Sequence, residues 1–365
     1  MSKHIVLVVG ARPNFMKAAP LIHAFQKKSE KFHITLIHTG QHYDFNLSQL
    51  FFDDLAIPKS DIYLGVGSGS HAKQTADVMI ALEKELEHLT PDLVIVFGDI
   101  NSTLATAVVT AKLGLKLAHV EAGLRSFDNS MPEEINRIVT DRLANYHFVT
   151  EQAGVDNLLQ EGISKEHIVL VGNIMIDSLK KMIPQFSNSK ILSILQLTKQ
   201  NYIAVTMHRP SNVDDKLKLE KYLQVLNELS HKMPVVFPCH PRTLKMIQEF
   251  KLDSLTTSPQ FHLVEPLGYI DFLALLASSK FVITDSGGIQ GDTTYLQIPC
   301  LTIRSNTEQP ETISIGSNTL CGEDIDFLQG KIDEILSGKY KKSSLPQFWD
   351  GATAERIVTY LEKNL

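Results

Sequence analysis

Three carboxylates stand at positions where they could act as acids and bases on a carbon atom. Asp99 and Glu121 follow the apolar runs Leu93–Phe97 and Leu117–Val120, and Glu133 opens a segment of helical period. Paired carboxylates near one substrate can remove a proton from one face and return it to the other. The pattern therefore indicates proton transfer at carbon, provided that the fold brings these side chains together.

Each carboxylate also has a purely structural interpretation. Asp99 could cap a helix that begins near Ser102, and Glu121 could accept hydrogen bonds from loop amides. The segment Ser130-Met131-Pro132-Glu133 fits a capping box with proline just inside the helix, and this would not exclude catalysis. Glu134 faces elsewhere around the helix and is expected to be solvated or ion-paired.

A glycine-rich turn in the second half of the chain is suited to an anion. Asp285-Ser286-Gly287-Gly288 follows the buried run Phe281–Thr284 and precedes a helical segment. Such a turn presents glycine amides together with a helix N-terminus, and both attract phosphate. The alternative is an ordinary strand-to-helix turn in which Ser286 is the N-cap.

Basic side chains gather at strand ends, although the chain has a net charge of −6. In a chain that is acidic overall, such cations indicate an anionic ligand, most simply a diphosphate. His208 and a second strand-end histidine, His240, could be general acids or phosphate ligands, or only hydrogen-bonded structural groups. The cations that indicate the diphosphate are Arg12, Lys17, His208, Arg209 and Arg242.

Short runs rich in Val and Ile alternate with longer helical segments, which predicts βαβ units and parallel sheets. We expect an α/β protein of two doubly wound, Rossmann-like domains, at residues 1–172 and 173–351, with residues 352–365 packing back on the first. Ligands bind at the carboxyl ends of strands in such sheets, so two facing edges would form an active site between the domains. The expected strands are Ile5–Val9, Ile34–His38, Leu93–Phe97, Leu117–Val120, Tyr146–Val149, Ile168–Val171, Tyr202–Thr206, Val235–Phe237, Phe261–Val264, Phe281–Thr284 and Pro299–Ile303.

Composition excludes several classes of protein. With 365 residues, of which 43% are hydrophobic and 21% charged, the chain has the composition of a soluble globular protein. Its negative charge argues against a nucleic-acid partner, and no stretch approaches the roughly 20 apolar residues that a bilayer requires. Three cysteines lack metal-binding spacing, so we expect a cytoplasmic protein with no metal. The sequence also lacks GxGxxG after the first strand, a P-loop and a Ser-His-Asp order, which argues against a nicotinamide enzyme or a serine hydrolase.

At these residues the sequence resembles the UDP-N-acetylglucosamine 2-epimerases of the non-hydrolysing bacterial type. The matching motifs run in order along almost the whole chain, and HVEAGLR at 119–125 together with PEEINR at 132–137 is highly specific. The resemblance implies a glycosyltransferase-B-like fold that holds a UDP-sugar between two domains, no metal or other cofactor, and a homodimer. The other motifs are GARP at 10–13 with Lys17, TGQH at 39–42, Gly98-Asp99, His208-Arg209, DSGGIQ at 285–290, and Asp350-Gly351 with Arg356-Ile357.

The resemblance also implies roles for individual residues. Asp99, Glu121 and Glu133 would be the acid and base carboxylates, and His208 would assist departure of the diphosphate. UDP would be eliminated in the anti sense to give 2-acetamidoglucal and then re-added after protonation of the opposite C-2 face, which interconverts UDP-GlcNAc and UDP-ManNAc. The residues expected to bind substrate are Arg12, Lys17, Gln41, Arg137, Arg209, His240, Ser286, Gly287, Gly288 and Asp292.

Several positions depart from the family pattern. Gly291-Asp292 replaces two glutamates, so ribose recognition would rest on the shorter aspartate, and Gln309 stands where the family has an arginine near the diphosphate. Pro210-Ser211 follows His208-Arg209. Asp44 stands in place of the glutamine expected in the segment that, in the family, binds an activating second substrate molecule. These departures argue against allosteric activation and leave open a modified UDP-HexNAc as the substrate.

Three other functions fit many of the same residues. A hydrolysing epimerase would release N-acetylmannosamine and UDP. A glycosyltransferase of this fold is less favoured, because three carboxylates in one domain suit proton transfer at carbon better than a single base for an acceptor hydroxyl. A relative that only binds UDP-sugars is encouraged by Gly291 and Gln309.

Overall fold

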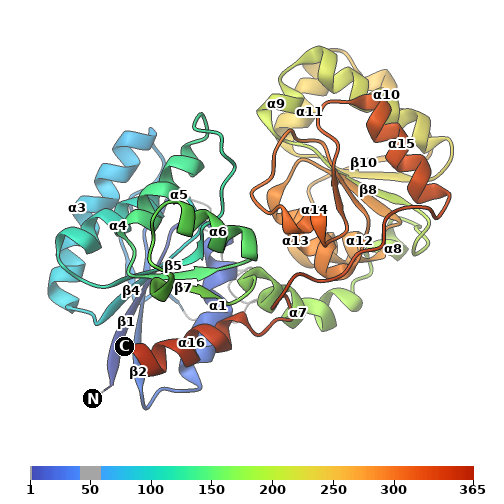
Figure 1. Ribbon diagram of the computed structural model, residues 1–365. Helices are drawn as coiled ribbons and strands as arrows, with labels where there is room; N and C mark the ends of the chain where they lie inside the picture. Colours follow the sequence, from blue (N-terminus) through green and yellow to red (C-terminus); the bar gives the residue numbers. More distant parts are fainter. Residues whose placement is uncertain (1, 42–58) are drawn as a thin grey trace. The chain divides into compact units, whose positions relative to one another are not determined.

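The computed structural model describes residues 2–41 and 59–365, and the chain divides into two compact units (Figure 1). Unit 1 comprises Met1–Lys180 and Gln347–Leu365, and unit 2 comprises Lys181–Pro346. The division falls inside helix α7 (Ile174–Ser187) rather than after residue 172. The first half of α7 is tied to unit 1, because the hydroxyl of Ser178 donates to the carbonyl of Met16.

Unit 1 is built on a parallel sheet, which in the described residues has the strand order β3-β2-β1-β4-β5-β6-β7. The chain runs outward from β1 to β3 and then returns to β4 beside β1. The topological switch point, where ligands bind in doubly wound sheets, therefore lies between β1 and β4. The strands are β1 (Lys3–Val9), β2 (Phe32–His38), β3 (Ile62–Tyr63), β4 (Leu93–Phe97), β5 (Leu117–Ala122), β6 (Tyr146–Val149) and β7 (Ile168–Leu170).

Helices cover both faces of this sheet (Figure 1). On one face, Val6, Val94 and Leu82 belong to a buried apolar cluster shared by the strands, α3 and α4. On the other, α16 lies beside α1, where Lys28 and Lys31 both pair with Glu362. The helices are α1 (Arg12–Gln26), α3 (His71–Leu89), α4 (Asn101–Lys112), α5 (Pro132–Leu143), α6 (Gln152–Gln160), α7 and α16 (Thr353–Asn364), with a 3₁₀ turn at Lys165–His167.

Unit 2 repeats the plan with a parallel sheet in the order β10-β9-β8-β11-β12-β13. Its switch point lies between β8 and β11. Phe237 and Phe281 are fully buried in its core. The strands are β8 (Ile203–Thr206), β9 (Val235–Pro238), β10 (Phe261–Val264), β11 (Phe281–Thr284), β12 (Cys300–Thr302) and β13 (Asn318–Leu320). The helices are α8 (Ile191–Ile194), α9 (Pro210–Val213), α10 (Lys216–Ser230), α11 (Pro241–Glu249), α12 (Tyr269–Ser278), α13 (Gly287–Leu296), α14 (Glu311–Ser314) and α15 (Ile325–Leu336), with a 3₁₀ turn at Asp253–Thr256.

The predicted α/β class with two doubly wound parallel sheets is confirmed. The sequence does not predict β3 and β13, because runs of two or three residues carry too little pattern. Among residues 2–41 and 59–365, no helix combines the length and apolar character needed to span a bilayer.

Candidate active site

Glu121 lies at the end of β5 in an unusual backbone conformation. The register of β5 with β6 shifts between Val120 and Ala122, and Glu121 has a left-handed φ of 74°. A non-glycine residue adopts this conformation at a cost in free energy, and β-bulges of this kind re-aim side chains. The carboxylate forms an ion pair with Lys17 of α1, in which the side chains are only 12% (Lys17) and 11% (Glu121) exposed. The candidate base and a predicted phosphate ligand are therefore in direct contact.

The turn after β4 makes room for the same lysine. Gly98 has a φ of 60°, and a Cβ atom there would lie 2.7 Å from Nζ of Lys17. The left-handed backbone favours glycine here, and any side chain would also displace the ammonium group of Lys17 from its present position.

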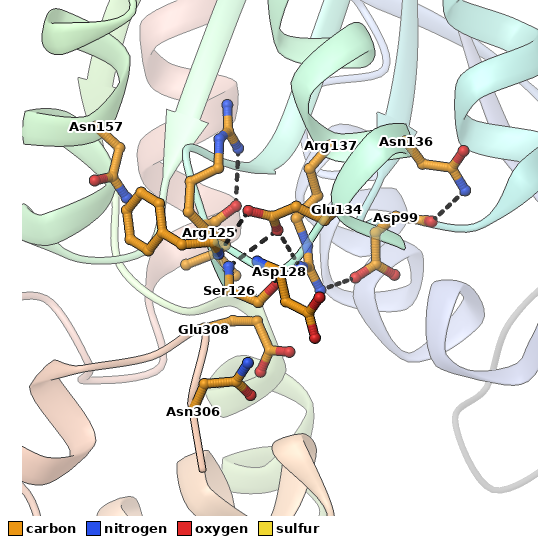
Figure 2. A network of polar contacts seen from close by, with 12 residues as sticks. Asp99, Arg125, Ser126, Asp128, Glu134, Asn136, Arg137, Asn157, Asn306 and Glu308 are labelled. Atoms are coloured by element: carbon orange, nitrogen blue, oxygen red, sulfur yellow. Dashed lines mark hydrogen bonds and ion pairs between the residues drawn. The ribbon is translucent and has the colours of Figure 1, made fainter. Parts of the chain in front are cut away.

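Asp99, the next residue, is held by helix α5. Its carboxylate pairs with Arg137, and the side-chain amide of Asn136 donates to its carbonyl oxygen at 2.8 Å (Figure 2). The N-cap of α4 is Ile100, which makes no side-chain cap, so the interpretation of Asp99 as a helix cap is wrong. Arg137 therefore contacts a candidate catalytic carboxylate.

Glu134 is buried, not solvated, and holds the loop that precedes α5. It accepts the backbone N–H groups of Ser126 at 2.9 Å and Phe127 at 2.8 Å, and it pairs with Arg137 at 2.9 Å (Figure 2). Arg137 thus lies between Glu134 and Asp99. The expectation of an ion-paired Glu134 is confirmed, and this ion pair orients the arginine.

The predicted capping box at residues 130–133 is wrong. The N-cap of α5 is Met131, which makes no cap hydrogen bond, and the hydroxyl of Ser130 donates to Asp128 at 2.6 Å. Glu133 is exposed on the first turn of the helix. The Glu133 carboxylate therefore does not take part in a helix cap.

Asp141, which the sequence prediction omits, links the ends of β4 and β5. Its carboxylate lies 2.6 Å from Nδ1 of His119, accepts the N–H of Gly123 at 3.0 Å and pairs with Arg125 at 2.7 Å. The other ring nitrogen of His119 lies 2.8 Å from the carbonyl oxygen of Gly98. Burial alone would raise the pKa of Asp141, but His119 and Arg125 outweigh it and lower the pKa to about 2. The sequence carried a partial signal, because a buried Arg125 needs an acidic partner, but it does not indicate which carboxylate is that partner.

The remaining ligands predicted for unit 1 lie near its switch point. Arg12 is exposed at the first position of α1. The side-chain oxygen of Gln41 accepts the N–H of Ser102 at 3.1 Å and its hydroxyl at 2.7 Å, which joins the end of β2 to α4. His42 and Asp44 lie outside the described residues.

The predicted anion turn of unit 2 lies at the start of α13, directly after β11. Ser286 is the N-cap but makes no side-chain cap, and its N–H donates to Oγ1 of Thr284 at 3.0 Å. A Cβ at Gly288 would meet nothing within 4 Å, and one at Gly287 would meet nothing nearer than Nη1 of Arg304, at 3.5 Å. The first turn of α13 therefore presents its backbone to open space, as anion binding requires.

His208 stands across the switch point, after β8, and contacts Asp285 at the end of β11. The fully buried Asp285 carboxylate lies 3.1 Å from Nδ1 of His208 and accepts the backbone N–H groups of His208 at 2.9 Å and Arg209 at 2.8 Å. Burial would raise the pKa of Asp285, but hydrogen bonds from His208 and Arg209 outweigh it and lower the pKa. Asp285 is therefore ionised at neutral pH.

His240 and Arg242 are more constrained than predicted. Nδ1 of His240 accepts the N–H of Arg242 at 3.2 Å and so caps α11. The His240 ring centroid lies 5.8 Å from that of His208. The guanidinium of Arg242 pairs with Asp214, with Nε at 2.9 Å, so this cation is engaged by an aspartate within unit 2.

Two residues that depart from the family pattern, Asp292 and Gln309, place polar atoms in the interior of unit 2. Asp292 is buried on α13, and burial raises its pKa to about 7. Oε1 of Gln309 is buried and has no hydrogen-bond partner among the described residues. Arg304 forms a buried ion pair with Glu308 through two hydrogen bonds, at 2.8 and 3.1 Å. Its guanidinium charge is therefore balanced within unit 2.

The described residues contain no cluster of three or more His, Cys, Asp or Glu side chains able to hold a metal ion. Unit 1 brings two ion pairs to the turn after β4: Lys17–Glu121, which lies against Gly98, and Asp99–Arg137, at the next residue. Unit 2 brings His208, His240 and the turn at Ser286 to its own switch point.

Comparison with known proteins identifies the family. A family model described as UDP-N-acetylglucosamine 2-epimerase matches residues 24–362. The chain belongs to this family. The UDP-N-acetylglucosamine 2-epimerase of Methanocaldococcus jannaschii is 39% identical over 361 residues, which are 97% of this chain and 98% of that protein. The UDP-2,3-diacetamido-2,3-dideoxy-D-glucuronate 2-epimerase of Pseudomonas aeruginosa is 37% identical, over 98% of this chain and 99% of that protein.

Solved structures of the 2-epimerase family match the fold. The crystal structure of M. jannaschii UDP-GlcNAc 2-epimerase in complex with UDP-GlcNAc and UDP has a TM-score of 0.87 at 37% identity and covers 99% of both chains. A glycosyltransferase of Rickettsia africae, at 14% identity and a TM-score of 0.60, shares the fold alone. The predicted 2-epimerase family and its glycosyltransferase-B-like fold are therefore confirmed.

Proposed function

We propose that the protein interconverts UDP-GlcNAc and UDP-ManNAc by inverting the configuration at C-2. The observation that supports this best is the contact of Glu121 with Lys17 at the switch point of unit 1, close to the Gly98-Asp99 turn. It places a carboxylate for proton transfer beside a cation suited to a diphosphate. A protein that only bound a UDP-sugar would not need a carboxylate in a strained backbone there.

The reaction divides into an elimination and an addition. One carboxylate takes the C-2 proton, the C–H electron pair forms the C1–C2 double bond, and the C-1–O bond breaks with its electron pair going to UDP. A second carboxylate then protonates C-2 from the opposite face while the UDP oxygen attacks C-1. We assign these transfers to Asp99, Glu121 and Glu133, each positioned by a different segment of unit 1.

Unit 2 supplies the groups for the leaving diphosphate in this proposal. The C-2 hydrogen is weakly acidic, so the barrier must be shared between the base and stabilisation of the departing negative charge. The open amides of Gly287 and Gly288 suit the phosphates, and His208 suits the bridging oxygen. Asp292 remains the candidate for the ribose, and Arg12, Gln41, Arg209 and His240 the further substrate ligands.

A modified UDP-HexNAc is the second candidate substrate. The observation that favours it is the buried side-chain oxygen of Gln309, which has no partner among residues 2–41 and 59–365 and could accept a hydrogen bond from a substituent of the sugar. The P. aeruginosa relative, whose name specifies a diacetamido sugar acid, is almost as similar as the M. jannaschii enzyme.

Incubation of the enzyme with UDP-GlcNAc in D₂O, followed by NMR, tests the proposal. We expect deuterium at C-2 and an equilibrium mixture of two UDP-sugars. Free N-acetylmannosamine with UDP would assign the hydrolysing reaction. The same incubation is repeated with the UDP-linked diacetamido sugar acid, and the absence of deuterium from both sugars would leave only a binding function.

We further infer that two copies associate through unit 1. An apolar groove between α3, α4 and α5 includes Met79, Leu104 and Ile135, and the adjacent Ile80 is 61% exposed. Exposed apolar side chains gathered on one face are typical of protein–protein interfaces. The partner proposed is a second copy, as the family resemblance implies.

A further inference from the structure

We propose that Asp285 is a positioning residue that fixes the tautomer of His208, so that only Nε2 of the ring exchanges a proton with the leaving oxygen. The inference rests on the proposed function for the role of His208, but the geometry that carries it lies wholly within unit 2.

Asp285 has several hydrogen-bond partners, and they lie in the turn and short helix that follow β8. One oxygen accepts the N–H of Arg209 at 2.8 Å and the side-chain amide of Asn212 at 3.2 Å, and the other lies 3.1 Å from Nδ1 of His208. Its side chain is 0% exposed, whereas that of His208 is 44% exposed. One end of the imidazole is thus anchored in the protein interior, and the remainder reaches the surface of the unit.

The identity of the partner determines where the ring proton lies. An ionised carboxylate can only accept hydrogen bonds, so Nδ1 of His208 must carry hydrogen in the neutral ring as well as in the charged one. Nε2 is then the nitrogen that gains and loses the proton. This is the role that a buried aspartate plays towards a catalytic histidine elsewhere in enzymology.

The neighbouring histidine has the opposite tautomer. Nδ1 of His240 accepts the N–H of Arg242 at 3.2 Å, so a neutral His240 carries its proton on Nε2. Burial first, and then the charges of His208 and Arg242, lower the pKa of His240 and favour that neutral form. Within the described residues, the charged and titratable groups around His208 are Asp285, directly after β11, His240 and Arg242 from the β9–α11 segment, and its own neighbour Arg209. Through Nε2, His240 can therefore donate a hydrogen bond, whereas His208 exchanges a proton through the same atom of its own ring.

Long-range ¹H–¹⁵N NMR of the histidine rings tests the assignment directly. The His208 signal is identified by its loss in H208Q, and in the wild-type chain we expect the neutral ring to carry hydrogen on Nδ1. A ring with hydrogen on Nε2 would overturn the proposal without any need for the aspartate variant to fold. This measurement does not depend on turnover, so it stands apart from the C-2 deuterium test of the proposed function.

The variant D285N then separates positioning from simple support of the turn. Asparagine can still accept the N–H of Arg209, but its amide cannot discriminate in favour of Nδ1–H, so the ring should shift to a mixture or to Nε2–H. Loss of the correct tautomer should lower kcat by a factor on the order of 10²–10⁴ with little change in KM. The matched control N212A removes another contact of the same carboxylate and should retain the wild-type tautomer and most of kcat. If D285N keeps the wild-type tautomer, or if N212A lowers kcat equally, Asp285 supports the turn and does not set the proton.

Discussion

The carboxylate of Asp141 lies 2.6 Å from Nδ1 of His119, and both side chains are almost completely excluded from solvent. Through its second ring nitrogen His119 reaches the carbonyl of Gly98, and Asp141 itself accepts the N–H of Gly123. Gly98, which precedes Asp99, is therefore linked to Asp141 through His119, and Gly123, two residues after Glu121, is linked to Asp141 directly. The relative positions of two candidate catalytic carboxylates depend on a residue that touches neither.

Replacing Asp141 by asparagine should strongly destabilise unit 1. The substitution removes the negative charge that Asp141 places between His119 and Arg125 and, among the described residues, leaves Arg125 paired with Glu161 alone, and breaking a buried pair in this way costs about 3–5 kcal/mol. Urea denaturation should show this loss, with the midpoint moving to lower concentration. The control D156N changes an exposed aspartate on α6 and should be near neutral; equal midpoints for the two variants would contradict the structural role.

The variants D99N, E121Q and E133Q should each lower turnover by roughly 100-fold or more, the contribution of a positioned proton-transfer group. UDP binding, measured by calorimetry, should remain largely intact, because each change is nearly isosteric and leaves the proposed diphosphate ligands of both units in place. E83Q, an exposed glutamate of α3, provides the control. Near-wild-type turnover in any of the three would remove that residue from the catalytic set.

The alternation of apolar runs and helical segments was sufficient to predict both sheets, because parallel strands buried on both faces have a strong local pattern. The clustering of side chains at strand ends followed from the same argument. The residues that hold these side chains could not be predicted. Asp141, Glu134 and Asp285 act through partners distant in the sequence, and whether a carboxylate is solvated or buried depends on what packs over it.

The stability of the protein should depend on pH through Asp177. This carboxyl accepts the N–H groups of Thr353 and Ala354 at the start of α16, yet burial raises its pKa to about 6 despite those bonds. The folded state therefore binds this proton more tightly than the unfolded chain, whose pKa is near 3.8. The resulting stabilisation is complete below about pH 4 and is lost as the pH rises through about 6, a difference of about 3 kcal/mol.

Comparison of D177N with the wild type between pH 4 and pH 8 tests this linkage. The asparagine side chain does not ionise, so the variant should gain stability relative to the wild type as the pH rises through that window. D333N, at an exposed aspartate of α15, should keep a constant difference from the wild type. A D177N difference that is equally independent of pH would show that the carboxyl has an ordinary pKa.

Saturating UDP should make the protein more compact if the proposed division of labour is correct. The diphosphate would contact Arg12 and Lys17 of unit 1 and the α13 turn of unit 2, and so join the two units. Small-angle scattering should show a smaller radius of gyration with UDP, and R12A should weaken the effect. The same radius with and without UDP would reject ligand-driven closure.

Association through the α3–α5 groove predicts a specific mutational effect. M79E and I135E together should convert a dimer to a monomer in sedimentation analysis, because charged side chains would have to be desolvated in the interface. The control I315E changes a partly exposed apolar residue of unit 2 and should not affect the mass. A dimer that survives the double change would have to use another surface.

Unit 1 consists of two segments separated in sequence by the whole of unit 2. Helix α16 buries Ala354, Ile357, Val358 and Leu361, and Trp349, just before it, donates to the carbonyl of Thr150. During translation these residues emerge from the ribosome only after residues 181–346. Until then unit 1 cannot complete its fold, and the surface of α1 that α16 will cover remains exposed to water. Unit 2 is continuous and has no such delay. The second unit synthesised is therefore the first that can finish folding, and the unfinished first unit is where a nascent chain would most need a chaperone.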